Sequence, residues 1–181
     1  MSEFYQGVLE RLMRYAKVDT QSANGVSCVP TTAKQFDLAR ILKKEMEEIG
    51  VSNVWLDEDK CVVYGILPSN LDHESLKVGF VAHMDTAPDA SGTDVKPWLL
   101  KDYDGRDIVL NQEKNIVMKV SDFPNLKNYL HQDLVLTDGT TLLGGDDKAS
   151  IAAIMTAALY MTFLIDRHSP VNYPDYCISS V

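Results

Sequence analysis

Helix-like and strand-like spacings of apolar residues alternate along most of the chain. In residues 1–18, apolar side chains recur every three or four positions among charged ones, which predicts an amphipathic helix. Thr32 and Gln35 have capping-box spacing and predict the start of a second helix, which Gly50 would end. Residues 149–165 are apolar and carry no charge, and they predict a third, buried helix.

Between the second and third helices, short apolar runs indicate strands. Residues 51–56 and 61–67 form two such runs across the polar turn 57–60, and residues 77–82 form another. Residues 95–133 hold only short apolar pieces and give no clear assignment. The alternation of helices and strands predicts an α/β fold, in which functional loops lie at the ends of the strands.

The strand predicted over residues 77–82 is followed by a histidine and a carboxylate, His83 and Asp85, two residues apart. Side chains two residues apart in an extended backbone share a face. The carboxylate can therefore orient an imidazole that holds a divalent metal. The same spacing also occurs in ordinary hydrogen-bonded pairs, so this motif alone does not establish a metal site.

A second candidate loop, residues 142–148, joins a polar turn to the third helix with the sequence Leu-Leu-Gly-Gly-Asp-Asp-Lys. Its two glycines allow a tight turn, and Asp147 fits the cap of the following helix. Asp146 has no such role, and neighbouring carboxylates repel each other unless a cation lies beside them. Oxygen and imidazole ligands from two loops suit zinc, manganese or cobalt.

Three segments together resemble the peptidase T family, the tripeptide aminopeptidases among the cocatalytic zinc peptidases. They are residues 83–92, 94–97 and 134–156. The His-Met-Asp-Thr and Gly-Asp-Asp-Lys elements are similar to the wider superfamily, and the Pro-Asp-Ala-Ser-Gly and Thr-Leu-Leu-Gly elements resemble the peptidase T branch. Gly145 stands where the family more often has alanine, and Ser150 where it often has glycine.

The resemblance implies a zinc-exopeptidase-like catalytic domain with a mixed sheet, flanking helices and two zinc ions. His83 would bind one zinc, Asp146 would bridge both, and Asp85 would serve catalysis by orienting His83. The family usually holds the peptide bond after the bridging aspartate in cis, which here is the Asp146–Asp147 bond. In the family's reaction, a zinc-activated water releases the N-terminal residue of an unblocked tripeptide.

Other features of the family pattern are missing from this sequence. The pattern continues with a Glu-Glu pair that supplies the general base and a ligand, then with another carboxylate and a distant histidine. After Lys148 the acidic residues are Asp166 and Asp175 and the histidine is His168, and no Glu-Glu pair follows. We do not expect His168 to replace a missing ligand, because it lies in residues 161–181, which match nothing in the family pattern.

We therefore expect residues 1–160 to be the N-terminal part of a truncated peptidase domain and residues 161–181 to be an unmatched tail. A frameshift near residues 160–161 is one hypothesis, and a shorter natural relative with its own ending is the other. A hydrolase without its general base and half of its ligands loses its activity. The chain alone is expected to be inactive, so a non-catalytic fragment with weak or no metal binding is the alternative to a metallo-aminopeptidase.

Composition fits a soluble, cytoplasmic protein, with 45% hydrophobic and 24% charged residues. A net charge of −9 argues against nucleic acid and against a basic membrane-binding surface. The three cysteines are widely spaced and predict neither a disulfide framework nor a zinc knuckle. The N-terminal helix is unlike a signal peptide. Small peptides are the expected partners, and the resemblance allows a homodimer in the full-length family.

Overall fold

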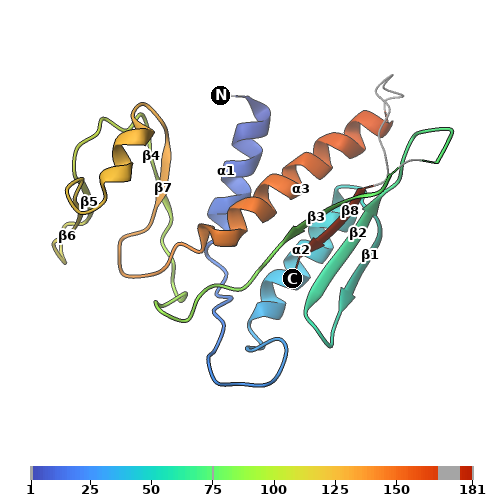
Figure 1. Cartoon of the computed structure of the whole chain (residues 1–181), viewed down its shortest axis with the longest axis horizontal. Coiled ribbons are helices and arrows are strands. Elements are labelled where there is room, and N and C mark those ends of the chain that lie inside the picture. Colours follow the sequence, from blue (N-terminus) through green and yellow to red (C-terminus); the bar gives the residue numbers. More distant parts are fainter. Residues whose placement is uncertain (1, 75, 167–175, 181) are drawn as a thin grey trace.

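The computed structural model describes residues 2–74, 76–166 and 176–180, which form a helix-covered sheet and a smaller lobe beside it (Figure 1). The larger part contains the helices α1 (Glu3–Tyr15), α2 (Gln35–Glu48) and α3 (Gly145–Asp166). Its sheet is formed by the strands β1 (Ser52–Asp57), β2 (Val62–Leu67), β3 (Val78–Ala82) and β8 (Tyr176–Ser180). The predicted α/β class is confirmed.

The sheet has the strand order β1-β2-β8-β3. It is mixed, because β8 runs antiparallel to β2 and parallel to β3. Ile178 of β8 lies opposite Gly65 on one side and Phe80 on the other. Strand β8 comes from the segment expected to be an unmatched tail, and the structure places it inside the sheet rather than beside it. The mixed sheet with flanking helices is the architecture that the resemblance implied.

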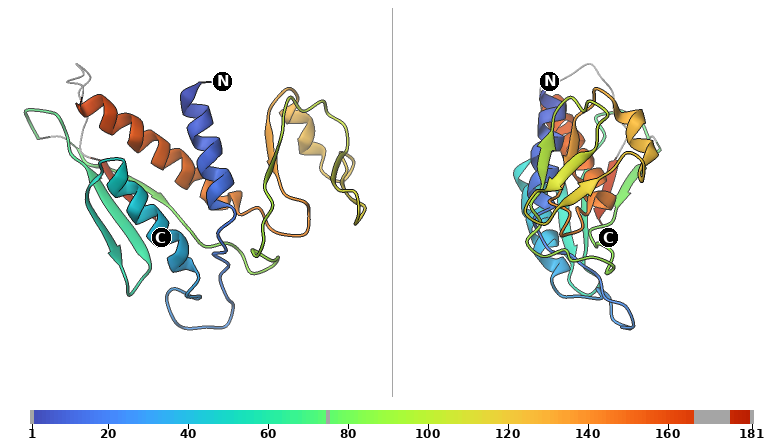
Figure 2. Two further views of the ribbon diagram at one scale, coloured as in Figure 1. Left: turned by 180° about the vertical axis from the view of Figure 1, so that it is seen from behind. Right: turned by 90° about the vertical axis from the view of Figure 1, so that its left-hand side faces the viewer.

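One face of the sheet is covered by α2 and α3, and α1 packs on α3 (Figure 2). Leu42 of α2, Met155 of α3 and Ile178 of β8 are buried together in this core. Burial of such apolar side chains is the main driving force of folding. Gly65 allows the sheet to approach the end of α2 closely, because a Cβ atom there would lie 2.5 Å from Val51 Cγ1.

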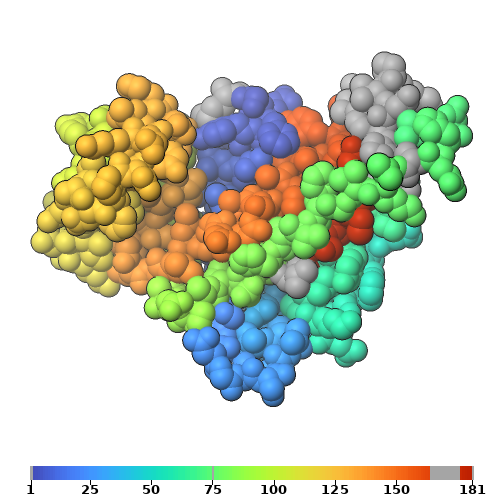
Figure 3. Space-filling view, in the orientation of Figure 1, coloured from blue at the N-terminus to red at the C-terminus, as the bar shows by residue number. Residues whose placement is uncertain are grey.

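The opposite face of the sheet carries exposed apolar side chains. Trp55 stacks on Tyr64 with ring centroids 4.8 Å apart, and Trp55, Ile66 and Val81 are exposed. Strand β3 is an edge strand in the described part of the chain, and Figure 3 shows it at the surface of the molecule. An exposed edge with apolar side chains is a surface on which another chain can pack.

The smaller lobe contains short elements that the sequence pattern largely left unassigned. They are β4 (Trp98–Leu100), β5 (Ile108–Asn111), β6 (Ile116–Met118), the 3-10 helix η1 (Pro124–Tyr129) and β7 (Leu134–Leu136). Strand β4 pairs with β7, and β5 pairs with β6. The Tyr5 hydroxyl of α1 donates to Asp133 Oδ2 at 2.9 Å and so connects the lobe to the larger part.

The helices follow the predicted pattern, with one difference at the start of α2. This helix begins at Gln35, and no side chain caps it. The hydroxyl of Thr32, the expected cap, instead donates to the backbone oxygen of Gln21 at 2.7 Å. Helix α3 covers the uncharged segment, and Ala152 and Ala158 within it are fully buried. None of the helices in the described ranges combines the length and apolar character needed to cross a membrane.

Candidate functional site

The structure brings the three predicted site residues together. His83 directly follows the last residue of β3, and its Nδ1 lies 3.1 Å from both the Oδ1 and the backbone oxygen of Asp85. Its Nε2 faces the other loop and lies 3.0 Å from Asp146 Oδ1. The carboxylate of Asp85 therefore holds one side of the imidazole while the other side points at Asp146. Their assignment as zinc ligand, orienting group and bridging ligand stays a prediction.

The ring of His83 lies between two carboxylates, and they affect its pKa. Burial lowers the pKa of His83, but the hydrogen bonds to Asp146 and Asp85 outweigh burial, so its pKa is raised overall. The side chain of Asp146 is 95% exposed and leaves the site open to solvent on that side. A divalent cation entering there would displace the proton from Nε2, because a ligating histidine must be neutral.

Residues 142–148 run into the irregular first turn of α3, and the chain turns sharply there to present Asp146. The peptide bond between Asp146 and Asp147 is cis, as the resemblance implied, and both residues depart from helical φ and ψ angles. Gly144 has a φ of +70°, and a Cβ atom there would lie 2.8 Å from the Thr86 side chain. Glycine is therefore required at this point for the two loops to touch.

The donor atoms fit a zinc ion by chemistry and by spacing. Zinc in proteins takes imidazole nitrogen and carboxylate oxygen ligands, and tetrahedral bonds of about 2.0–2.1 Å place two ligand atoms about 3.3 Å apart. The 3.0 Å between His83 Nε2 and Asp146 Oδ1 is close to this spacing. Asp85 occupies the place of the carboxylate that commonly orients a ligating histidine.

The site supplies only part of a ligand set. Among the described residues, no group of three or more His, Cys, Asp or Glu side chains is arranged to hold a metal ion. His73 and His131 are exposed and lie beside Asp72 and Asp102, as expected of solvated histidines. His168 lies outside the described residues. His83 and Asp146 thus provide two of the four donors that a tetrahedral zinc site needs.

Two buried polar residues, Lys148 and Thr20, lie behind the site, and the sequence pattern did not single out either of them as a functional residue. Lys148 is buried, and its Nζ donates to the backbone oxygen of Val18 at 2.7 Å. Burial lowers the pKa of Lys148 to about 8, against an opposing effect of Asp19. Thr20 is fully buried and donates to the backbone oxygen of Met84 at 2.7 Å. The sequence did carry a signal for Lys148, because it is a lysine at the start of an otherwise uncharged helical segment.

The curated relatives of this chain are longer proteins. A peptidase T of Desulfitobacterium hafniense is 48% identical over 172 residues, which are 95% of this chain and 40% of the relative. A peptidase T of Fusobacterium nucleatum is 48% identical over 178 residues, which are 98% of this chain and 42% of the relative. Both alignments necessarily extend beyond residue 160, and the domain division at that residue stays a prediction. No family model matches the sequence.

Solved structures support the fold. The crystal structure of aminopeptidase PepT from Bacillus cereus matches 97% of this chain and 35% of its own chain, with a TM-score of 0.61 and 19% identity. At that identity the likeness shows the architecture alone. The sequence relatives support a family assignment as well as a fold, because about half of the aligned positions are identical. Over the two fifths of the relatives' length that it spans, the chain belongs to the peptidase T family.

Proposed function

We propose that this chain carries part of the metal centre of a metallo-aminopeptidase that releases the N-terminal residue from tripeptides. The supporting observation is the 3.0 Å approach of His83 Nε2 to Asp146 Oδ1, with Asp85 on the other ring nitrogen. An imidazole oriented by a carboxylate is a common arrangement at zinc sites. The family resemblance suggests zinc as the metal and tripeptides as the substrates.

Each of the three side chains would have a distinct task. Asp85 would accept a hydrogen bond from Nδ1–H of His83 and so direct Nε2 toward the side where a cation would bind. His83 and Asp146 would hold zinc, with Asp146 shared between two ions. Two zinc ions, when bound, would acidify a water molecule and polarise the peptide carbonyl. The exposed side of Asp146 leaves room for a short peptide to approach.

A non-catalytic fragment with weak or no metal binding is the second candidate. It is favoured by the absence of a third metal-binding side chain near His83 and Asp146 among the described residues. The Glu-Glu pair that would supply the general base after Lys148 is also missing from the sequence. Catalysis requires that base and the full set of charge-stabilising groups. We therefore expect the 181 residues alone to bind zinc weakly and to hydrolyse no tripeptide.

Zinc binding by the purified chain tests the proposed site. His83→Ala is compared with His131→Ala, a matched control because His131 is exposed and lies 3.0 Å from a carboxylate oxygen of Asp102. Binding is measured by competition with a chromophoric chelator, and circular dichroism confirms that each sample is folded. We expect His83→Ala to remove the zinc binding and His131→Ala to leave it unchanged. An equal effect of both substitutions would contradict a site at His83.

Hydrolysis of an unblocked tripeptide, followed on the same samples, separates the two candidates. No turnover by a folded, zinc-binding chain supports the non-catalytic form of the proposal. Turnover that a chelator stops and His83→Ala abolishes would show that this chain has a complete catalytic site, and it would overturn the non-catalytic candidate.

A further inference from the structure

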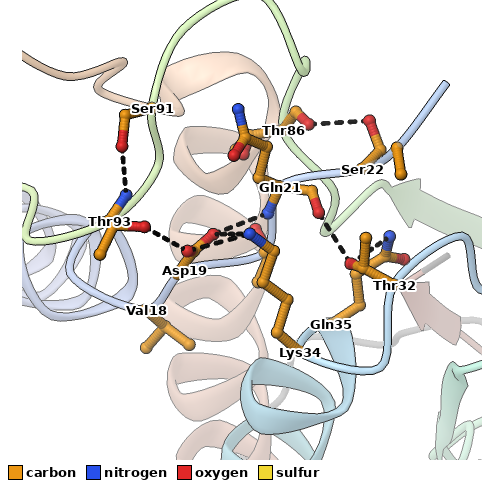
Figure 4. Close-up of polar contacts among 12 residues, drawn as sticks. Val18, Asp19, Gln21, Ser22, Thr32, Lys34, Gln35, Thr86, Ser91 and Thr93 are labelled. Carbon is orange, nitrogen blue, oxygen red and sulfur yellow. Dashed lines mark hydrogen bonds and ion pairs between the residues drawn. The ribbon is translucent and has the colours of Figure 1, made fainter.

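A short segment, residues 18–22, lies behind the candidate metal site, and we call it the linking segment. It is held against the loop that carries His83 by several hydrogen bonds. Thr20 Oγ1 donates to the Met84 oxygen at 2.7 Å, and the Thr86 amide donates to the Thr20 oxygen at 3.1 Å. The amide and the hydroxyl of Ser22 both donate to the Thr86 oxygen, at 2.9 and 3.0 Å (Figure 4).

The same segment is also held by the loop that carries Asp146. Lys148, two residues after Asp146, donates from Nζ to the Val18 oxygen at 2.7 Å. Its amide donates to the Gly144 oxygen at 3.3 Å, within the turn that presents the aspartate. Only 2% of Lys148 is exposed. A buried ammonium is costly unless it is hydrogen-bonded, so the contact with Val18 strongly favours one position of the lysine.

Asp19 stabilises the linking segment at its centre. Its carboxylate accepts hydrogen bonds from the Gln21 amide at 3.0 Å and from Thr93 Oγ1 at 2.8 Å, and it pairs with Lys34 Nζ at 2.9 Å (Figure 4). These donors come from three different parts of the chain. One donor lies within the segment itself, so the carboxylate fixes the segment to the parts of the chain that carry Lys34 and Thr93.

We infer that the linking segment is a positioning element that sets the separation between His83 and Asp146 through Thr20 on one side and Lys148 on the other. The loops also touch directly where Gly144 meets Thr86, and the segment holds them from behind. Metal sites need their ligands within about 0.5 Å of the productive geometry. The effect of the segment on metal binding rests on the proposed function. Its hydrogen-bonded connection between the two loops does not.

Hydrogen exchange of the complete chain tests the link without any metal. Thr20→Val removes the bond to Met84, and Lys148→Met removes the bond to Val18 while keeping a long side chain. We expect each substitution to speed exchange about tenfold or more in both loops, residues 83–87 and 143–147. The effect on the loop that the altered side chain does not contact is the decisive observation, because a purely local role would not produce it.

Two controls sharpen this comparison. Thr20→Ser keeps the hydroxyl and should restore the exchange rates of the unaltered chain. Thr156→Val removes another fully buried hydroxyl, which donates to Ala152 within α3 and accepts from Arg11 of α1 but contacts neither loop, and it should leave both loops unchanged. If Lys148→Met does not fold, the Val and Ser substitutions at Thr20 decide the question. Faster exchange confined to residues 83–87 in Thr20→Val, or faster exchange throughout the chain, would overturn the inference.

Zinc affinity, measured on the same variants, tests the functional consequence. We expect Thr20→Val and Lys148→Met to weaken zinc binding about tenfold, with Thr156→Val unchanged. If the unaltered chain binds no zinc while the exchange pattern is as expected, the proposed function fails and the positioning role stands. If zinc binds and its affinity is unchanged in both variants, the link does not position the ligands, and the inference is wrong.

Discussion

At the residue scale, Asp19 makes the stability of the chain depend on pH. Burial raises the pKa of Asp19, but the hydrogen bonds from Gln21, Lys34 and Thr93 outweigh burial, so the pKa is lowered overall. A carboxyl with a lowered pKa stabilises the fold above its unfolded-state pKa of about 3.9. This contribution is lost as the pH falls through the pKa of the folded state.

We expect Asp19→Asn to reduce the free energy of unfolding by about 1.5–3 kcal/mol at neutral pH, the range for hydrogen bonds to a charged group. The difference from the unaltered chain should shrink in acid, because the unaltered carboxyl is then protonated. Urea unfolding at several pH values measures both effects. If the difference in free energy of unfolding between the two chains stays constant from neutral pH into acid, the carboxylate does not have this role.

The three cysteines should differ in reactivity. Burial raises the pKa of Cys61 to about 11, whereas Cys28 and Cys177 are exposed. Because the thiolate is the reactive form, Cys61 should react with a disulfide reagent only after unfolding. We expect a variant that retains only Cys61 to react far more slowly when native than when denatured. Equal rates in the two states would show that Cys61 is accessible.

At the scale of elements, helices α1 and α2 are joined through one nearly buried carboxylate. Arg11 Nε lies 2.9 Å from Glu45, and Arg14 Nη2 and the Tyr15 hydroxyl each lie 2.6 Å from it. Removing one partner of a buried ion pair leaves an uncompensated charge, which costs about 3–5 kcal/mol. We expect Glu45→Ala to lower the free energy of unfolding by about 3 kcal/mol, measured by chemical denaturation.

Glu47 is the matched control on the same helix, because its ion pair with Lys43 is exposed. Exposed pairs contribute about 0–1 kcal/mol, so Glu47→Ala should have little effect. Similar losses for the two alanine variants would mean that Glu45 acts only through helix propensity.

At the scale of the whole molecule, the open face of the sheet and the β3 edge should promote self-association. Val81 lies on β3 and is 65% exposed, and Trp55 and Ile66 lie on the same open face. A lysine on an edge strand opposes pairing with another chain. We expect Val81→Lys to reduce concentration-dependent association, measured by analytical ultracentrifugation.

Val109→Lys provides the control, since Val109 is similarly exposed but lies on β5 in the lobe. Val109→Lys adds the same charge to the chain without altering the four-stranded sheet. If both substitutions reduce association equally, net charge rather than the β3 edge is responsible.

Elements with a strong local pattern were predictable, and elements that depend on distant partners were not. Strands β1 and β2 follow adjacent apolar runs across a short turn, so their pairing is encoded locally. Strands β4 and β7 have three residues each and pair across the lobe, and such short segments carry little periodicity. Thr32 had the spacing of a helix cap, but its hydroxyl donates to the Gln21 oxygen and accepts from the side-chain amide of Gln35 instead of a backbone amide of α2.

The sequence by itself determined the α/β class, the family resemblance and the identity of the candidate site residues His83, Asp85 and Asp146. These depend on residue types and on spacings along the chain. The tertiary structure alone decided that His83 Nε2 and Asp146 Oδ1 lie 3.0 Å apart and that Lys148 and Thr20 are buried behind them. The physical reason is that hydrogen bonds between distant segments form only after packing has excluded water and chosen their partners.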